Sequence, residues 1–360
     1  MMTGGVFVAG LGTYIPESFP AERAVELGLY SRDEYEASGW TGAAVAGDLS
    51  APDMAVRAAN QALARSGHRP SEVGLLLHAT FLHQGPDAWS AHHYVQRHTV
   101  GHNIPAFEIR QACTGMLGAM ELACCYLTVG THLPAALVTG ADNFGTPLID
   151  RWRYSAAAGS NRRSVFGDAG AAILLSRRTG FARLLAIASA SLPDLEEMQR
   201  GDRPLFPPTC TIGEPVQMGE RIAEFQRKHP AAFADARNEL HQARTNLVSQ
   251  VLDEAGVSRA DISRVAHVFG GTEEYVRGVL EPLGIDVSKG LHEFGRKLGH
   301  LGVNDQIVGL THLVETGAVG VGDHVLMLGN GVGISLSCAV AEITDQVDWA
   351  PLPRPGAATK

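Results

Sequence analysis

The pattern of apolar and polar positions around residue 113 predicts a buried strand that leads directly into a buried helix. Residues 104–109 form a short apolar run typical of a strand, and a stretch rich in alanine, leucine and methionine, typical of a helix, runs on to Leu127. Between them lie residues 111–115, with Cys113 at the centre. A cysteine at such a junction lies near unpaired backbone N–H groups and the positive end of the helix dipole, and both favour its thiolate.

Cys113 has two interpretations at this point. A thiolate attacks carbonyl carbon, so the first interpretation is a nucleophile that accepts an acyl group. The second is a buried, inert packing residue, which is the usual fate of a cysteine. This segment alone does not decide between them.

The chain also repeats its pattern at a constant offset of 189 residues. In each copy a helical pattern (residues 53–65 and 234–254) ends at a glycine and is followed by an apolar strand. The paired positions are Gly67 with Gly256, Glu72 with Asp261, Val73 with Ile262, His78 with His267 and Gly140 with Gly329. Several matches in one register indicate a duplicated α/β unit, which predicts two mostly parallel sheets with helical layers.

The same offset places Cys113 opposite position 302, inside the segment 299–305. A two-fold relation between the halves brings these segments together, so His300 and Asp305 are expected as partners of Cys113. In that arrangement Asp305 orients the imidazole of His300 and stabilises its charged form. The alternative for Asp305 is a charge partner for the N-terminus of the helix expected over residues 305–315.

Composition and charge narrow the class of protein. The chain has 360 residues, an apolar fraction of 45% and 41 glycines, which is typical of a compact cytosolic α/β protein. Its 5 cysteines lack framework spacing, which favours reduced thiols. The net charge of −9 argues against nucleic acid and anionic membranes as partners. We see no signal-peptide pattern and no membrane-spanning apolar run, so a cytoplasmic protein is expected.

Neither the histidines nor the glycine-rich stretches predict a cofactor. No histidine pair at helical spacing is completed by a nearby cysteine or carboxylate, so no metal site is expected. Residues 10–12 lead into Pro16 rather than a helix, and residues 329–333 lie between two apolar strands, so neither stretch is a dinucleotide motif. The second stretch suits a tight turn whose backbone N–H groups approach a ligand.

Four motifs taken together resemble the type III ketosynthases of the thiolase superfamily. They are Val8-Ala-Gly-Leu-Gly-Thr-Tyr-Ile-Pro-Glu17, Ala112-Cys-Thr-Gly115, Ala136-Leu-Val-Thr-Gly-Ala-Asp142 and Phe166-Gly-Asp-Ala-Gly-Ala-Ala172. The resemblance implies an α/β protein with a thiolase-like, five-layered α-β-α-β-α fold and internal duplication, a homodimer, and Cys113 as the acyl-accepting nucleophile. It also implies an oxyanion hole built from the backbone N–H groups of Cys113 and Gly331. Two halves, 1–180 and 181–345, and a flexible tail, 346–360, are expected.

Departures from the family pattern bear on the reaction. A condensing member carries a His-Gln-Ala-Asn motif whose histidine falls here on Gly270, and the second family residue, an asparagine, falls on His300. The pair that supports decarboxylation of a malonyl thioester is therefore missing as a pair. Members that use coenzyme A carry arginines after a Thr-Gly, where this chain has Ala43-Ala-Val45. A carrier-protein phosphopantetheine is thus favoured as the donor over coenzyme A.

The sequence thus predicts a homodimeric acyltransferase that resembles the ketosynthase-III-like enzymes of polyketide antibiotic pathways. An acyl group of polyketide, aryl or malonyl type moves from an acyl carrier protein or coenzyme A thioester to Cys113. His300 then deprotonates an acceptor hydroxyl, such as that of a sugar, or the thiol of a second carrier protein. Two alternatives stay open: a condensing synthase in which His267 or His300 supports decarboxylation, and a non-catalytic subunit that shapes a partner's tunnel.

Overall fold

The structure is a computed structural model that describes residues 2–130, 132–155, 164–347 and 349. Its strands are β1 Met2–Tyr14, β2 Ser18–Pro20, β3 Gly42–Ala44, β4 Val73–Ala79, β5 Ala106–Ile109, β6 Ala135–Asp142, β7 Ala169–Ser176, β8 Ala182–Ser191, β9 Ile262–His267, β10 His324–Gly331 and β11 Ser335–Ile343. Its α-helices are α1 Ala21–Glu26, α2 Arg32–Ser38, α3 Ala51–Arg65, α4 Ala91–His98, α5 Gly115–Thr128, α6 Glu196–Arg200, α7 Met218–Lys228, α8 Pro230–Ala255, α9 Glu273–Leu280, α10 His292–Gly295 and α11 Asp305–Glu315.

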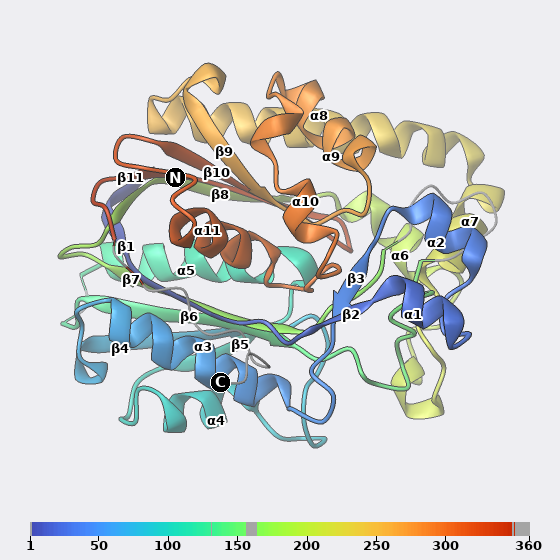
Figure 1. Cartoon of the computed structure of the whole chain (residues 1–360), viewed down its shortest axis with the longest axis horizontal. Coiled ribbons are helices and arrows are strands. Elements are labelled where there is room, and N and C mark those ends of the chain that lie inside the picture. Colours follow the sequence, from blue (N-terminus) through green and yellow to red (C-terminus); the bar gives the residue numbers. More distant parts are fainter. Residues whose placement is uncertain (1, 131, 156–163, 348, 350–360) are drawn as a thin grey trace.

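The helices and strands stack in five layers (Figure 1). α8 and α9 cover β8, β9, β10 and β11; α11 and α5 form the middle layer; and α3 and α4 cover the strands of the other half. The predicted five-layered α-β-α-β-α fold is therefore confirmed. α5 lies between two layers of strands, which explains why apolar residues occur on all of its sides rather than on one stripe.

The order of the strands repeats the duplication seen in the sequence. It reads β5-β4-β6-β7-β1-β8-β11-β10-β9, so β7, β6 and β4 follow β1 as β11, β10 and β9 follow β8. β6 and β10 begin at Ala135 and His324 and end at Asp142 and Gly331, an offset of 189 at both ends. The predicted duplication and its register are confirmed.

The expectation of two mostly parallel sheets was wrong. β1 pairs with both β7 and β8, so the nine strands named in this order form one hydrogen-bonded series. Within that series only β4–β5, β4–β6 and β9–β10 are parallel pairs. The reason lies partly in the connections: β10 and β11 are joined by three residues, which can form a hairpin but not a parallel crossover.

Close backbone approach fixes the helix that covers the first half. α3 begins after Ser50, whose hydroxyl accepts the Asp53 N–H, and lies on β1 and β7. A Cβ atom on Gly12 of β1 would stand 2.0 Å from the Ala58 carbonyl oxygen of α3, so only glycine permits this packing. The glycines of β1 that resemble a dinucleotide motif thus serve helix–sheet contact.

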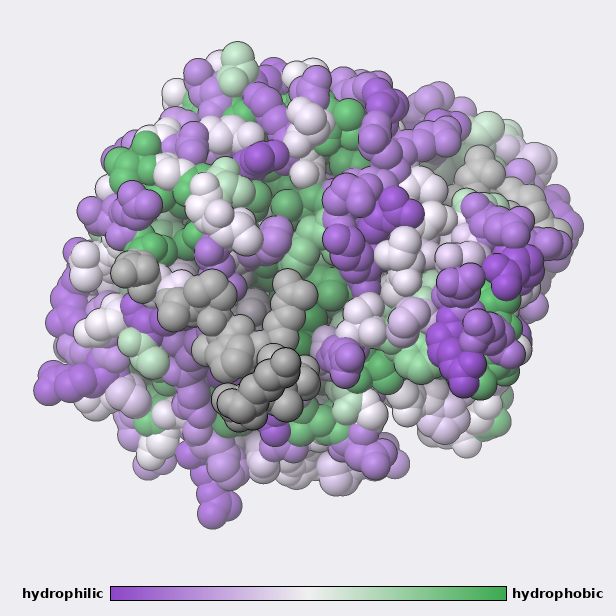
Figure 2. All heavy atoms as spheres, viewed as in Figure 1, coloured by the Kyte–Doolittle hydropathy of each residue, from purple (hydrophilic) through white to green (hydrophobic). Residues whose placement is uncertain are grey.

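The outer surface is mainly hydrophilic on the face shown in Figure 2. No helix in the described part of the chain is long and apolar enough to cross a membrane. Most of the expected flexible tail (348 and 350–360) lies outside the described residues. The boundary expected near residue 180 stays a prediction.

Candidate active site

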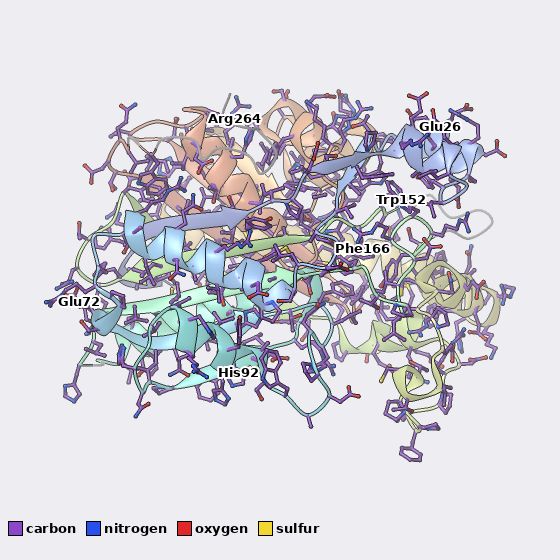
Figure 3. All side chains as sticks on the ribbon, turned by 60° about the horizontal axis from the view of Figure 1, so that its bottom comes forward. Glu26, Glu72, His92, Trp152, Phe166 and Arg264 are labelled. Atoms are coloured by element: carbon purple, nitrogen blue, oxygen red, sulfur yellow. The ribbon has the colours of Figure 1, made fainter. Side chains whose placement is uncertain are left out.

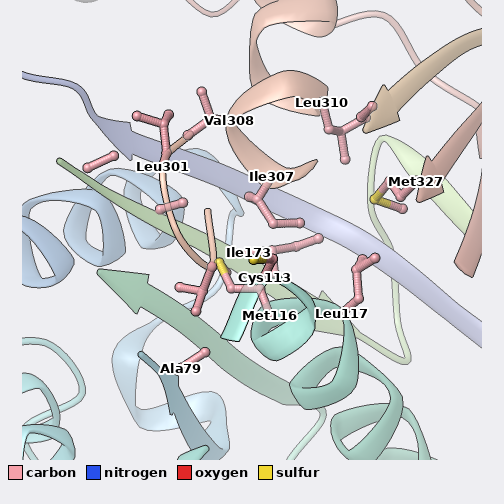
Figure 4. Close-up of a cluster of buried hydrophobic side chains, with 14 of the residues drawn as sticks. Ala79, Cys113, Met116, Leu117, Ile173, Leu301, Ile307, Val308, Leu310 and Met327 are labelled. Atoms are coloured by element: carbon pink, nitrogen blue, oxygen red, sulfur yellow. The ribbon is translucent and has the colours of Figure 1, made fainter. Parts of the chain in front are cut away.

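Cys113 lies in a short 3-10 turn, Ala112–Thr114, that opens directly into α5. The residue before it, Ala112, has a φ of +46°, a left-handed conformation that is uncommon without a glycine and tends to mark functional sites. The side chain of Cys113 is buried but for 6% of its surface. Figure 4 places Cys113 beside buried apolar side chains of α5, such as Met116, and of α11, such as Ile307. The predicted position of Cys113 at the start of a helix is confirmed.

His300 comes from the segment between α10 and α11, in the other half of the molecule. Its backbone N–H donates to the Val165 carbonyl at 2.7 Å, and its own carbonyl accepts from Gly167 N–H at 3.0 Å. The Phe166 ring lies 5.1 Å from the imidazole, centroid to centroid, and Figure 3 shows Phe166 inside the molecule. Two backbone hydrogen bonds and a ring contact therefore hold His300 in place.

The three predicted residues form one hydrogen-bonded row. Cys113 Sγ lies 2.9 Å from His300 Nε2, and His300 Nδ1 lies 2.6 Å from Asp305 Oδ2. This arrangement fixes the tautomer: Nδ1–H faces the carboxylate, and Nε2 faces sulfur. The predicted proximity of the three side chains is confirmed; their catalytic roles stay predictions.

Asp305 is the first residue of α11 and is fully buried. Its Oδ1 accepts the Leu301 N–H at 2.7 Å, and its Oδ2 accepts the Phe269 N–H at 3.0 Å. These two bonds satisfy a carboxylate that burial would otherwise penalise. The alternative reading of Asp305, a charge partner for the helix N-terminus alone, does not account for its contact with His300.

The charge balance of the row favours a protonated imidazole. Burial on its own lowers the pKa of His300, but the charge of Cys113, followed by that of Asp305, outweighs burial and raises this pKa well above its ordinary value. The surroundings of His300 thus favour its protonated form, the imidazolium. Because the charge of Cys113 is the larger of the two raising causes, a change that neutralises the sulfur lowers the pKa of His300.

Gly331 lies against the turn that carries Cys113. A Cβ atom placed on Gly331 would stand 3.1 Å from Thr114 Oγ1 and 3.3 Å from the Gln111 carbonyl oxygen. The Thr114 hydroxyl donates to Gln111 and contacts the Ser335 hydroxyl at 2.7 Å, which ties the turn to β11. The position suits the predicted oxyanion hole, whose second member is the Cys113 N–H; this role stays a prediction.

The histidine of the family's His-Gln-Ala-Asn motif has no equivalent here. A Cβ atom on Gly270 would stand 2.0 Å from the Tyr275 ring, so the space that a side chain would need is filled. His267, the alternative base, is buried in β9; its Nδ1 donates to the Val268 carbonyl and its Nε2 accepts the Leu291 N–H at 3.0 Å. Both nitrogens of His267 are occupied by backbone groups, so His267 is a packing residue.

Sequence reasoning missed two buried groups near the row. Asp142 accepts N–H groups from Phe81 at 2.7 Å and Val303 at 3.2 Å, and burial raises its pKa to about 7. It ties the end of β6 to the turn that precedes α11; its place at the end of the Gly-Ala-Asp motif was the available signal. Tyr154 lies close enough for the charge of Cys113 to raise its pKa further, after burial. No pattern in the sequence pointed to Tyr154.

The described residues contain no group of three or more histidine, cysteine, aspartate or glutamate side chains that could hold a metal ion. The remaining cysteines are free: Cys125 and Cys210 are exposed, while burial raises the pKa of the Cys124 thiol to about 12 and that of Cys338 further. A pocket lies beside the turn that carries Cys113, lined by Phe81, the residues 110–112, Ser191 and the residues 332–335.

Comparison with known proteins gives one consistent family. The family "3-Oxoacyl-[acyl-carrier-protein (ACP)] synthase III" matches residues 107–192, and its C-terminal counterpart matches residues 240–343. The beta-ketoacyl-[acyl-carrier-protein] synthase III of Thermosynechococcus vestitus is 25% identical over 349 residues, covering 94% of this chain and 99% of that protein.

Two solved structures extend the comparison. ChlB3, described as an acyltransferase, is 44% identical with a TM-score of 0.88, covering 96% of this chain and 100% of that one. The 3-oxoacyl-[acyl-carrier-protein] synthase III of Aquifex aeolicus has a TM-score of 0.74 at 22% identity, covering 94% of this chain and 100% of that one, and shares the fold.

Proposed function

The chain belongs to the 3-oxoacyl-[acyl-carrier-protein] synthase III family of the thiolase superfamily, and we propose that it is an acyltransferase rather than a condensing enzyme. It moves an acyl group from a thioester through Cys113 to an acceptor hydroxyl or thiol. The observation that carries this proposal is the row of Cys113, His300 and Asp305, combined with the filled space at Gly270. The similarity to ChlB3, described as an acyltransferase, supports it.

In the proposed first half-reaction, Cys113 acts as a thiolate beside the His300 imidazolium. The Cys113 thiolate attacks the carbonyl carbon of the donor thioester, and a carbon–sulfur bond forms. The N–H groups of Cys113 and Gly331 hold the resulting oxyanion. The bond to the donor sulfur then breaks, and the leaving thiolate takes the proton from His300 Nε2. Cys113 is now a neutral thioester.

Acylation prepares His300 for the opposite role. The largest cause that raises its pKa, the charge of Cys113, disappears when the sulfur is acylated. The neutral imidazole then accepts the proton of the acceptor hydroxyl or thiol while the acceptor attacks the thioester carbonyl. The bond to Cys113 breaks, and the thiolate–imidazolium pair is restored. Asp305 holds Nδ1–H throughout.

This site lacks the hydrogen-bond donors that decarboxylative condensation needs. Condensation needs two donors on the thioester carbonyl of the extender unit, where the enolate charge develops. Here the Gly270 position carries no side chain, and His267 is bound to backbone groups. Only His300 is left, and it is committed to Cys113 and Asp305.

The donor that we propose is an acyl carrier protein, because relatives in the family bear that substrate in their names and because arginines are absent at residues 43–45. We also propose a homodimer and a place in polyketide antibiotic biosynthesis, as the resemblance of the sequence implies. The dimer face is β5, which lies at one end of the strand order and bonds only β4.

Intact-mass measurement with a panel of acyl carrier-protein thioesters tests the acyltransferase. We expect the mass of the acyl group on the wild-type protein and none on Cys113→Ala. The exposed Cys125 and Cys210 are internal controls for unspecific labelling. With a malonyl donor labelled at its free carboxylate, the label should stay on the protein. Release of labelled carbon dioxide together with a β-ketoacyl product would contradict the proposal and favour the condensing alternative.

A further inference from the structure

Next to the catalytic row lies a cluster of polar side chains that the reaction described above does not use. Its first member, Tyr154, is separated from His300 by a single ring: the Tyr154 and Phe166 ring centroids are 4.6 Å apart, and Phe166 packs on His300. Tyr154 is buried, and its hydroxyl makes no hydrogen bond within the described residues. The charges of Cys113 and Arg221 both act on this hydroxyl, so the nucleophile and a cation both lie within electrostatic range of it.

The second member, Arg221, occupies the inward face of α7. The buried residues of this helix are Met218, Gly219 and Phe225, and Arg221 is three positions after Met218 and four before Phe225, on the same stripe. The Met218 N–H donates to the Tyr154 carbonyl at 3.0 Å, which docks the start of α7 on the tyrosine. A stripe position that normally carries an apolar side chain thus carries a guanidinium.

Arg221 forms no ion pair within the described residues, although the charge of Glu214 acts on it from a distance. The nearby carboxylates of Glu214 and Glu224 each bind Arg203 at 3.0 Å instead. Arg221 Nε is buried without a hydrogen-bond partner, and Nη1 makes only a long contact of 3.4 Å with the Gln199 carbonyl. Arg221 is half-buried, and a cation withdrawn from water without a counter-ion is costly, which is why such groups normally meet an anion.

The third member, Gln199 of α6, is 9% exposed, and its side-chain oxygen is buried without a partner. The oxygen and nitrogen of a glutamine amide exchange places when the side chain flips, so this position can also donate. The cluster therefore contains a phenol, a guanidinium and an amide, each able to donate to an acceptor oxygen.

We propose that Tyr154, Arg221 and Gln199 bind the far end of the acyl group and select acyl groups that carry a carboxylate, such as half-thioesters of short dicarboxylic acids. The proposal rests on the acyltransferase function, because Cys113 must hold the near end of the same group. An arginine fork matches the two carboxylate oxygens, and the tyrosine hydroxyl donates a further hydrogen bond.

This assignment also explains how such an acyl group is transferred without losing its carboxylate. Loss of carbon dioxide requires the carboxylate to give up its negative charge to the enolate, and a guanidinium that stabilises the carboxylate opposes that step. A malonyl group bound in this way keeps its carboxylate during transfer to the acceptor.

Rates of Cys113 acylation by matched pantetheine thioesters test the proposal: malonyl against propionyl, and succinyl against butyryl. Intact mass follows the acyl-enzyme in wild type, Arg221→Gln, Arg221→Lys and Tyr154→Phe. Arg227→Gln is the matched control, because Arg227 lies exposed on the same helix. The wild-type protein should prefer each carboxylate-bearing donor by about tenfold or more, the scale of one hydrogen bond to a charged group. Arg221→Gln should abolish the preference, Arg221→Lys should keep part of it, and Arg227→Gln should leave it unchanged.

The outcomes separate this inference from the acyltransferase itself. Equal rates for the matched donors in wild type, or a preference that Arg221→Gln leaves intact, would overturn the carboxylate assignment while acylation of Cys113 still stood. Faster acylation by a hydroxybenzoyl thioester than by succinyl, lost in Arg221→Gln, would overturn it in favour of a phenolic acyl group. No acylation by any donor would overturn both proposals.

Discussion

At the scale of single residues, His300 acts first as a proton donor during acylation of Cys113 and then as a general base during transfer to the acceptor. A substitution should separate these two roles. His300→Ala should slow transfer to the acceptor by a factor of about 10²–10⁴, the usual contribution of a general base. Acylation of Cys113 should suffer less, because the start of α5 still favours the thiolate. Asp305→Asn should cost less than loss of His300, because it removes only the orienting charge. Single-turnover kinetics of the two half-reactions measure this; equal loss in both would contradict the assignment.

The ionisation of His300 gives a second prediction at this scale. The charge of Cys113 is the larger of the two causes that raise the pKa of His300, while burial opposes them. Cys113→Ala removes that cause, so the pKa of His300 should fall, and the imidazolium should lose its proton at a lower pH than in wild type. Acylation of Cys113 should act in the same direction. Nitrogen-detected NMR of the labelled ring follows both; an unchanged titration in Cys113→Ala would contradict the coupling.

At the scale of elements, a buried ion pair joins the segments that frame the site. Arg151 donates to Asp168 Oδ2 at 3.0 Å, while the N–H groups of Ala46 and Phe144 each donate to one carboxylate oxygen at 2.8 Å. An asparagine at position 168 can accept only one of these N–H groups and leaves the Arg151 guanidinium without a counter-charge, bonded only to backbone carbonyls. Asp168→Asn should therefore lower the free energy of unfolding by about 3–5 kcal/mol.

Urea denaturation measures this change, and an exposed pair provides the control. Arg277 and Glu281 on and after α9 form an ion pair with both side chains about half exposed. Glu281→Gln should cost at most about 1 kcal/mol, since solvent screens such pairs. A similar loss of unfolding free energy in both variants would mean that the Asp168–Arg151 pair stabilises the fold no more than an exposed pair does.

Among the elements, some positions could be predicted from the sequence and others could not. The offset that pairs β6 with β10 also placed Cys113 opposite the start of α11, so periodicity alone located His300 and Asp305. Tyr154 and Arg221 have no such signal, because α7 meets the loop after β6 only through tertiary packing. The antiparallel pairing of β1 with β8 was missed for a similar reason: the residues of a strand do not determine which strands pair with it.

At the scale of the whole molecule, the two ends of the strand order differ, and this difference predicts how copies associate. Residues 287–289 lie against β9: Lys289 donates to the Ile262 carbonyl, and Arg264 donates to the Ser288 carbonyl. β5, at the other end, pairs only with β4 among the described strands, and Phe107 on it is 55% exposed. An uncovered edge with an apolar side chain favours pairing with a second copy about a two-fold axis.

A charge on that edge should therefore break the dimer. In Phe107→Glu, each copy would bring a carboxylate into a desolvated interface. Light scattering should therefore report the single-chain mass at concentrations where wild type gives twice that mass. Val321→Glu is the control, because Val321 is 65% exposed in the loop before β10, near the opposite end of the strand order. A single-chain mass for wild type, or dimers that survive Phe107→Glu, would exclude β5 as the contact. Dissociation by Val321→Glu would move the interface to the second half of the molecule.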